Sequence, residues 1–339
     1  MNATKPLITV IVPVHNAGSY LDRTLENLRA LDTRVDYEFI LVDDHSVDDS
    51  RLRIDGWGAV LPGEVTVLAA GQRGVAHARN QALAVATGAY VWLTDADDSW
   101  DPTIVVDMYE RARTTGADVV VCNATKRSPN GVGLGLITDA TIEETVPGPV
   151  AFTRLLDGRL QGHLWNKLFR RDLLGENPFP PTRAHSDLGG MLRILPAARA
   201  VATLPVSRYV YFQNPGSILN SDEYDSSDLE TCLRIATEVR ATLPGPSEAN
   251  GPFIEFKYRN VIVPVVNEFA RRSAGTRLQK QLHRASPSRR LVRWSELAVL
   301  AGRRRLRLAA QAALIKLSLR TYFAAFSLRR RTVGVTDAG

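Results

Sequence analysis

The chain has 339 residues, of which 45% are hydrophobic and 23% charged, so it is long enough for one large folded domain with an appendage and is not a disordered protein. No stretch reaches the roughly 18 consecutive apolar residues of a membrane-spanning helix, and the first nine residues do not resemble a secretory signal. The two cysteines, Cys122 and Cys232, lie far apart, which argues against a disulfide framework or a thiolate zinc site and predicts a reducing, cytoplasmic location.

The first predicted elements alternate between strand and helix. Leu7–Val14 and Tyr37–Val42 are runs rich in β-branched residues that each end in a polar cluster, as buried parallel strands do. Between them, leucines recur at helical spacing after Ser19, which is suited to cap a helix N-terminus. The same alternation continues with strands at 65–68, 90–94 and 118–122 and helices at 77–86 and 102–115. This pattern predicts an α/β fold, Rossmann-like, with a mostly parallel central sheet flanked by helices.

The second half of the chain is less regular. Residues 128–149 are rich in Gly, Pro and Thr and predict loops with a hairpin. The sheet is expected to resume with strands at 199–204 and 208–213. A linker at 243–252 then precedes a basic helical region. We therefore expect one domain over residues 1–225 and a helical, basic C-terminal extension over 226–339.

Polar residues follow the predicted strands at what should be one edge of the sheet, where α/β folds bind ligands. The strongest signal is the carboxylate cluster Asp95-Ala96-Asp97-Asp98. Crowded carboxylates repel one another unless a cation or hydrogen-bond donors compensate them. Hard oxygen ligands suit Mg²⁺ or Mn²⁺, with the remaining coordination supplied by water and substrate phosphates. The alternative is an acidic turn that caps the helix following Pro102.

Two further segments suggest nucleotide binding. Asp44 follows the second strand, where a carboxylate can accept hydrogen bonds from a ribose hydroxyl or a base N–H. The alternative is that Asp44 or Ser46 caps the next helix. Arg79 lies near the start of the helix that follows Gly74, which favours contact with a diphosphate, although a salt bridge to the acidic strand ends is an equally good interpretation.

Four segments occur in order: PVHN at 13–16, VDDHSVD at 42–48, GVAHARNQAL at 74–83 and GAYVWLTDADD at 88–98. In order and spacing they resemble the family 2 glycosyltransferases, which have the GT-A fold. The resemblance implies that Asp44 binds the nucleobase, that Asp95 faces the ribose and diphosphate, and that Asp97 binds the metal. The other donor-binding positions it implies are Pro13, His15, Asn16 and Arg79.

The resemblance extends to the second half of the chain. The family's catalytic carboxylate falls on Asp187, although Ser186 replaces the usual preceding Glu, and His185 is either an additional metal ligand or a neighbour of the base. A rival interpretation makes Asp187 a helix cap, with Asp172 or Glu176 as the base. Trp165, Asn166 and Lys167 match the segment beside the acceptor, and Trp165 either stacks on a sugar or is a core tryptophan. Ser217 lies in a loop similar to one near the donor diphosphate.

The function implied is an inverting glycosyltransferase that uses a nucleotide-diphosphate sugar, with UDP-sugars favoured. A glycan or lipid-linked acceptor, in cell-surface polysaccharide or glycolipid synthesis, is the expected partner. A sugar nucleotidyltransferase is the first alternative, but such enzymes carry a Gly-rich loop with Arg and Lys where this chain has residues 14–18. A nucleic-acid-binding protein is the second, but the basic tail lacks stacking aromatics interleaved with its basic residues and a recognisable nucleic-acid-binding module, so we expect no nucleic-acid partner.

The C-terminal region carries a strong charge asymmetry. Between Arg271 and Arg331 there are 17 basic residues and one acid, Glu296. An apolar stripe recurs there at intervals of three and four, formed by Leu308, Ala312, Ile315, Leu319, Tyr322 and Phe326. The pattern predicts a surface helix on an anionic membrane, which would make the protein peripheral to the inner face of the membrane. The alternative is a helix that packs this stripe against protein.

Overall fold

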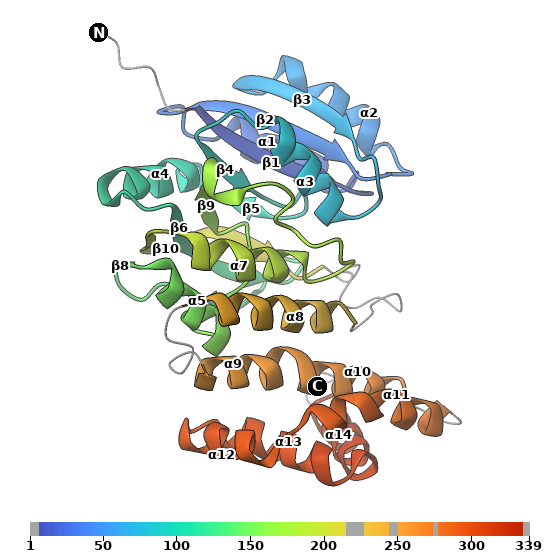
Figure 1. The fold of residues 1–339 in the computed structure, drawn as a ribbon. Helices are drawn as coiled ribbons and strands as arrows, with labels where there is room; N and C mark the ends of the chain where they lie inside the picture. Colours follow the sequence, from blue (N-terminus) through green and yellow to red (C-terminus); the bar gives the residue numbers. More distant parts are fainter. Residues whose placement is uncertain (1–6, 215–226, 244–249, 274–276, 335–339) are drawn as a thin grey trace. The chain divides into compact units, whose positions relative to one another are not determined.

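The computed structural model describes residues 7–214, 227–243, 250–273 and 277–334. The chain divides into two compact units. The first comprises residues 1–155 and 159–224, and the second comprises residues 156–158 and 225–339. A sheet with its helices forms the first unit, and helices form the second (Figure 1).

The first unit is built on a mixed sheet of ten strands, in the order β3-β2-β1-β4-β9-β6-β10-β5, with β7 paired to β6 and β8 paired to β10. The strands are β1 Leu7–Val14, β2 Asp36–Asp43, β3 Gly63–Ala69, β4 Tyr90–Leu93, β5 Ser99–Trp100, β6 Val119–Arg127, β7 Gly133–Ile137, β8 Thr145–Val146, β9 Lys167–Arg170 and β10 Val201–Phe212. The strands β1 to β4, β6 and β10 run in one direction, and β9 runs antiparallel between β4 and β6. The sheet is therefore less uniformly parallel than predicted, because β9 and the short strands β5, β7 and β8 pair antiparallel.

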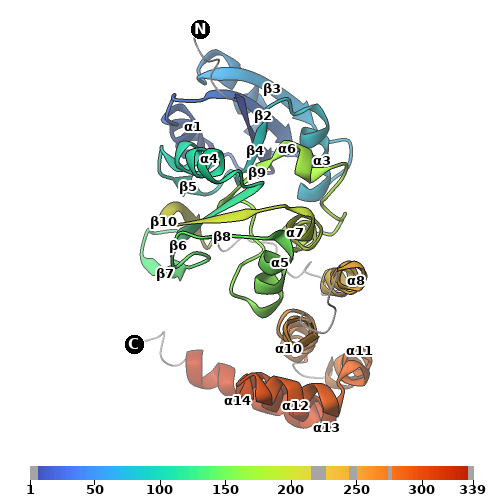
Figure 2. The same cartoon turned by 60° about the vertical axis from the view of Figure 1, so that its left-hand side comes forward.

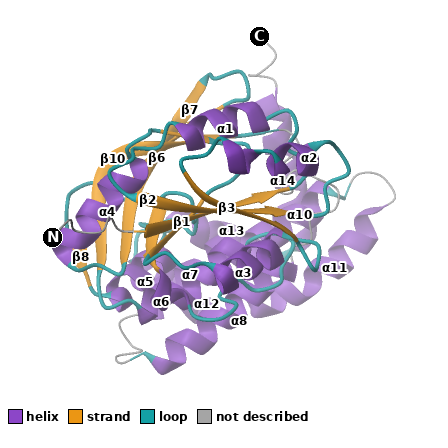
Figure 3. Ribbon diagram, turned by 90° about the horizontal axis from the view of Figure 1, so that it is seen from above, coloured by secondary structure: helices purple, strands orange, loops and turns teal. Residues whose placement is uncertain are grey.

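Helices cover both faces of this sheet (Figure 3). They are α1 Leu21–Arg29, α2 Ser50–Asp55, α3 Val75–Val85, α4 Ile104–Thr115, α5 Gly148–Asp157, α6 Arg171–Leu174 and α7 Ser186–Ala197. Leu28, Ile54 and Met108 bring α1, α2 and α4 into one apolar cluster with Val10 and Val12 of β1. The helices α3 and α7 lie on the opposite face. Both faces of the central strands are thus buried, which explains why β1 and β2 are continuous apolar runs.

Besides small differences at the ends of several elements, three features of the predicted elements differ from the structure or are refined by it. The helix α1 has Tyr20, not Ser19, at its N-cap position, with no side-chain capping bond. The strands predicted at 199–204 and 208–213 are one strand, β10, whose register against β6 shifts on either side of Ser207. A bulge keeps such a strand continuous although its sequence contains a Pro that suggests a break. The predicted hairpin in residues 128–149 is formed by β6 and β7.

The second unit is helical. It contains α8 Ser227–Thr242, α9 Asn250–Phe256, a π-helical segment Lys257–Ile262, α10 Val263–Arg271, α11 Leu278–Leu291, α12 Trp294–Gly302, α13 Leu306–Leu317 and α14 Leu319–Gly334. The last helices pack against one another and against α10 (Figure 2). Glu255 is buried and bonded to both Arg303 and Arg305, so these two cations of the tail have a structural partner.

The apolar stripe of the tail does not lie on one surface helix. Ser318 has an extended backbone and separates α13 from α14. Ala312, Ile315, Leu319 and Tyr322 are buried, and the Tyr322 hydroxyl donates a hydrogen bond to Asn267 Oδ1 at 2.7 Å. Leu308 and Phe326 are only partly buried. For the four buried residues the prediction of membrane contact is therefore wrong, and the alternative of packing against protein describes them. Within the described ranges, no helix combines the length and the apolar character needed to cross a bilayer.

Candidate active site

The carboxyl ends of β1 and β2 bring two of the predicted segments together. The backbone carbonyl of Asp44 lies 2.6 Å from His15 Nδ1, and the Val47 N–H donates to Asn16 Oδ1 at 2.8 Å. Pro13 is buried in β1, beyond the last residue that pairs with β4, so its missing N–H interrupts no bond to that strand. His15, Asn16 and Asp44 therefore form one connected rim at the edge of the sheet.

Asp44 is anchored to the start of α3. Its Oδ1 accepts a hydrogen bond from the Gly74 N–H at 2.7 Å, and Gly74 adopts φ 122°, a conformation that favours glycine. Neither Asp44 nor Ser46 caps the next helix, because α2 begins only at Ser50. The carboxylate therefore lies between the end of β2 and the N-terminus of α3, whose N–H groups favour negative charge.

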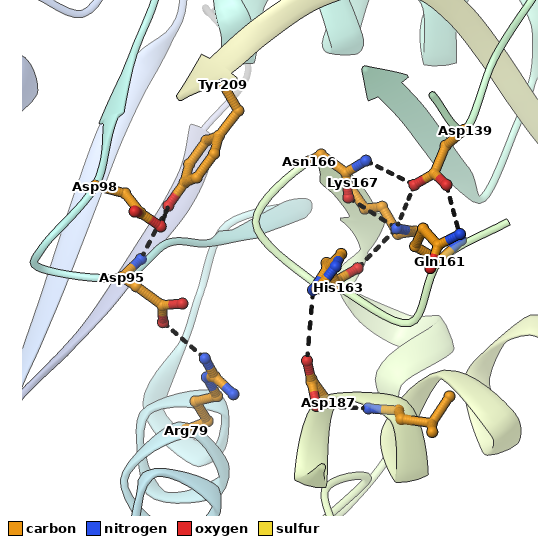
Figure 4. A network of polar contacts seen from close by, with 11 residues as sticks. Arg79, Asp95, Asp98, Asp139, Gln161, His163, Asn166, Lys167, Asp187 and Tyr209 are labelled. Carbon is orange, nitrogen blue, oxygen red and sulfur yellow. Dashed lines mark hydrogen bonds and ion pairs between the residues drawn. The ribbon is translucent and has the colours of Figure 1, made fainter. Parts of the chain in front are cut away.

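Arg79 is bonded to the carboxylate cluster. Its Nη2 donates to Asp95 Oδ1 at 2.7 Å, and the Arg79 residue is only 7% exposed (Figure 4). The salt-bridge interpretation of the sequence is thus the one realised in this structure. Such a charge-assisted bond fixes the orientation of the Asp95 carboxylate at the end of β4.

The next two carboxylates are tied to the end of β10. Asp97 Oδ2 accepts a hydrogen bond from Asn214 Nδ2 at 2.8 Å. Asp98 is buried and accepts bonds from the Tyr209 hydroxyl at 2.9 Å and the Phe212 N–H at 2.8 Å. Burial, followed by the charge of Asp95, raises the pKa of the Asp97 carboxyl, and burial likewise raises the pKa of Asp98 well above its usual value.

These residues fit a hard divalent cation. Burial and mutual repulsion leave negative charge that the neighbouring protein donors compensate only in part, and carboxylate oxygens are the ligands that Mg²⁺ and Mn²⁺ prefer. In the described ranges, no group of three or more His, Cys, Asp or Glu side chains forms a complete metal site. Asp95 and Asp97 therefore suit a cation whose coordination is completed by substrate phosphates and water.

The second half of the chain contributes Asp187 in the first turn of α7. Its Oδ1 accepts a bond from the Leu188 N–H at 2.8 Å, and its Oδ2 lies 3.9 Å from His163 Nδ1. The N-cap position belongs to His185, in the left-handed conformation with φ 61°, so Asp187 is not the residue that caps this helix. Ser217, the remaining predicted donor contact, lies outside the described residues.

Tyr211 relates the two halves of the site. Its ring centroid lies 6.4 Å from that of His163, whose Nδ1 is 3.9 Å from Asp187, and 5.9 Å from that of Trp165. Tyr209, two residues earlier on β10, donates a hydrogen bond to Asp98. Aromatic residues of β10 therefore connect the carboxylate cluster that follows β4 with the Asp187 carboxylate of α7. No spacing pattern in the sequence connects Tyr211 or His163 to the motifs, so neither residue was predicted.

Trp165, Asn166 and Lys167 do not present side chains to an acceptor. The Trp165 ring stacks nearly parallel on Tyr209, at a centroid distance of 4.5 Å, and on His163, at 4.6 Å. Asn166 and Lys167 have no exposed surface, and Lys167 Nζ lies 3.4 Å from Asp139 Oδ2. Because these three side chains are buried, the prediction that they contact the acceptor directly is wrong. They belong to the core of the first unit.

We expect the Lys167→Met variant to lose about 3–5 kcal/mol of unfolding free energy, because it leaves the buried Asp139 carboxylate without its charged partner. Urea unfolding followed by tryptophan fluorescence measures this, since Trp57, Trp92, Trp100 and Trp165 all lie in the first unit. The double variant Lys167→Met/Asp139→Asn removes both charges and should recover part of the loss. Equal stability of the single variant and the wild type would show that the pair contributes nothing.

Comparison with known proteins bears on the family and the fold of this chain. Residues 9–177 match the family model "Glycosyl transferase family 2". The glycosyltransferase GlyG of Streptococcus pneumoniae is 28% identical over 229 residues, covering 65% of this chain and 75% of that protein. Glycosyltransferase YibD of Escherichia coli is 33% identical over 181 residues, and the match spans only about half of it, 52% of each chain.

Among solved structures, S. aureus TarS 1–349 in complex with UDP-GlcNAc has a TM-score of 0.72, at 18% identity, over 96% of this chain and 92% of that one. At this level of identity, the structural similarity shows the fold alone. The aligned 96% of this chain includes C-terminal helices. The chain therefore belongs to glycosyl transferase family 2: it is a glycosyltransferase built on the GT-A fold.

Proposed function

We propose that this chain is a metal-dependent, inverting glycosyltransferase that transfers a sugar from a nucleotide-diphosphate sugar to a glycan or lipid-linked acceptor. The observation that carries the proposal is a series of contacts from the carboxylate cluster that follows β4 to Asp187 of α7. Tyr209 bonds to Asp98 and stacks on Trp165, Trp165 stacks on His163, and His163 Nδ1 lies 3.9 Å from Asp187. A donor diphosphate and an acceptor hydroxyl need these two kinds of group on opposite sides of the reacting carbon.

The donor-binding residues in this proposal are those at the strand ends. Asp44, with His15 and Asn16 beside it, would take the nucleobase and ribose, and Asp95 would face the ribose and diphosphate. Arg79 would act chiefly by orienting Asp95, to which it is bonded. A UDP-sugar is favoured because the structurally similar TarS was solved with UDP and with UDP-GlcNAc.

A divalent cation held by Asp97, with His185 as a second candidate ligand, would supply a Lewis acid that offsets charge developing on the diphosphate. Asp187 would accept the acceptor hydroxyl proton while that oxygen forms the new bond to the anomeric carbon. The bond from this carbon to the diphosphate oxygen breaks, and the nucleoside diphosphate leaves from the opposite face. Attack opposite the leaving group inverts the anomeric configuration.

The test of this function is a panel of UDP-, GDP- and CMP-sugars, each assayed with Mn²⁺ and with EDTA for thermal stabilisation and for release of nucleotide. The proposal expects one donor class to stabilise the chain more in Mn²⁺ than in EDTA and to be hydrolysed slowly. Stabilisation by no donor, or stabilisation equal in EDTA, would contradict the metal-dependent donor site.

We further propose that the protein is cytoplasmic and binds the inner face of the membrane through the second unit, by surface residues other than the buried stripe. Trp294, Leu306 and Leu317 are 55%, 66% and 64% exposed. The exposed cations Arg304, Arg307 and Arg320 lie in sequence beside the two leucines. Exposed apolar groups flanked by arginines suit an interface with anionic lipid headgroups, and a lipid-linked intermediate of a cell-surface polysaccharide is the acceptor class consistent with that location.

Replacing Arg304, Arg307 and Arg320 together with Ser should weaken binding to phosphatidylserine vesicles by about 100-fold at low salt, since each cation near such a surface contributes about 1 kcal/mol. Vesicle flotation at increasing salt measures this. Point substitutions are preferable to truncation after Ser273, because the removed helices pack on α10.

The matched control removes the same charge from the first unit, by Ser substitution of Arg34, Arg51 and Arg113, each of which pairs with an acidic residue there. If both triple variants bind vesicles equally, the tail has no specific role at the membrane.

A further inference from the structure

The histidine that faces the candidate base is held in place from several directions. Its carbonyl oxygen accepts a hydrogen bond from Lys167 Nζ at 2.7 Å, and its ring stacks on Trp165 with an interplanar angle of 18°. Lys167 is itself fixed by Asp139, which also accepts the Gln161 N–H at 2.8 Å (Figure 4). Both the backbone and the ring of His163 are therefore constrained, and its Nδ1 is directed at Asp187.

The loop that carries His163 packs directly on the first turn of α7. A Cβ added to Gly162 would lie 2.8 Å from Leu188 Cδ1 and 3.1 Å from Leu188 Cα. The Leu188 side chain could move away from such a Cβ, but its Cα belongs to the helix backbone and would have to shift by a few tenths of an ångström. Gly162 thus sets the separation between the loop and α7, and with it the distance from His163 to Asp187.

The stack of His163 on Trp165 continues to Tyr209, which is bonded to the carboxylate cluster. Tyr209 also stacks on Trp165, and its hydroxyl donates to Asp98 Oδ2. A continuous series of contacts therefore runs from Asp98 through Tyr209, Trp165 and His163 to the Asp187 carboxylate. Rigid rings at van der Waals distance maintain a fixed separation between the donor carboxylates and the base.

We propose that His163 is a positioning residue for Asp187: its Nδ1 orients the Asp187 carboxylate toward the acceptor hydroxyl, and Gly162 and Trp165 hold it at the required distance. This inference rests on the proposed role of Asp187 as the base. The 3.9 Å separation is longer than a hydrogen bond, and contacts of this kind tighten when substrate occupies a site. Burial lowers the pKa of the imidazole, which favours the neutral ring that can present Nδ1–H to a carboxylate.

Two substitutions of His163 distinguish the contribution of its Nδ1 atom from that of its ring stacking. His163→Phe keeps an aromatic face for Trp165 and removes Nδ1, whereas His163→Asn keeps a donor near the Nδ1 position and loses the stack. With the donor that the nucleotide-sugar panel identifies, we expect His163→Phe to lose about 10- to 100-fold in kcat with donor KM unchanged, because misplaced catalytic groups cost rates of this order. His163→Asn should retain most of the turnover while its Tm falls below that of His163→Phe.

Gly162 provides an independent variant. Gly162→Ala should push the loop away from α7 and lower kcat without changing donor affinity. Gly133→Ala is the matched control, because a Cβ at Gly133 meets nothing within 4 Å. Turnover of Gly162→Ala equal to that of the control would overturn the role assigned to the close approach.

A substrate-free measurement makes the result independent of the donor. The ¹⁵N-labelled full chain contains six histidines, and loss of a signal in His163→Phe assigns the His163 imidazole. We expect Asp187→Asn to shift the imidazole signal of His163, and Asp172→Asn to leave it unchanged. An unchanged signal in Asp187→Asn, or equal turnover of His163→Phe and wild type, refutes the positioning role. An active Asp187→Asn enzyme would instead refute the base on which the inference rests.

Discussion

Asp187→Asn should lower turnover by about 100-fold or more while leaving donor affinity nearly unchanged, because it removes the proton acceptor and keeps the size of the side chain. The general base must lie within hydrogen-bond reach of the acceptor hydroxyl, and Asp187 lies in the first turn of α7, 3.9 Å from His163 in the series of stacked rings that leads to the carboxylate cluster. Steady-state kinetics with the identified donor and acceptor, together with donor binding by calorimetry, measures both quantities.

The rival base offers a control for this experiment. The Asp172 side chain is 82% exposed and lies 3.5 Å from Arg171, so Asp172→Asn should retain normal turnover. Near-normal turnover of Asp187→Asn combined with reduced thermal stability would make Asp187 a structural residue. The base would then have to be sought elsewhere.

Asp97→Ala should abolish transfer and remove the gain in donor affinity that Mn²⁺ provides, while the chain remains folded. The physical reason is that Asp97 is the predicted metal-binding carboxylate in a cluster whose burial and mutual repulsion leave its charge poorly compensated. Donor titrations by calorimetry in Mn²⁺ and in EDTA give the affinity gain directly, without relying on turnover.

Asp97→Asn is the sharper companion variant, because an amide oxygen can still accept the bond from Asn214. It should keep the thermal stability of the wild type and still lose the Mn²⁺-dependent gain. Full activity of Asp97→Ala, or undiminished wild-type activity in excess EDTA, would remove the metal from the mechanism.

Local sequence patterns predicted the elements that are buried on both faces. The strand Leu7–Val14 has the same bounds in the sequence analysis and in the structure, because a run of β-branched residues ended by a polar pair has few other conformations available. The strand β9 was missed, since four residues paired antiparallel between β4 and β6 give no periodic signal of their own. The bulged strand β10 was divided in two, because the pairing that keeps it continuous comes from β6.

The carboxylates at the strand ends were found because neighbouring parallel strands end at one edge of a sheet, whatever the rest of the chain does. The side chains that bond to these carboxylates were not predicted. Arg79 had two equally good interpretations, and only the distance to Asp95 distinguishes them in this structure. The motif segment at Lys167 suggested an acceptor contact, but the Asp139 that neutralises it lies 28 residues away and could not be paired with it from the sequence.

The sequence by itself determined the family, the order of the strands and helices that carry the motifs, and the edge of the sheet where the carboxylates gather, since each depends on local pattern. Only the tertiary structure decided which side chains meet across the chain. It places His163 near Asp187, stacks Trp165 on two other rings, and buries four residues of the tail stripe within their own helical unit. The tail shows the reason most clearly. An apolar stripe at intervals of three and four has the same spacing whether it faces a membrane or a protein core, so the identity of its partner is a property of the fold.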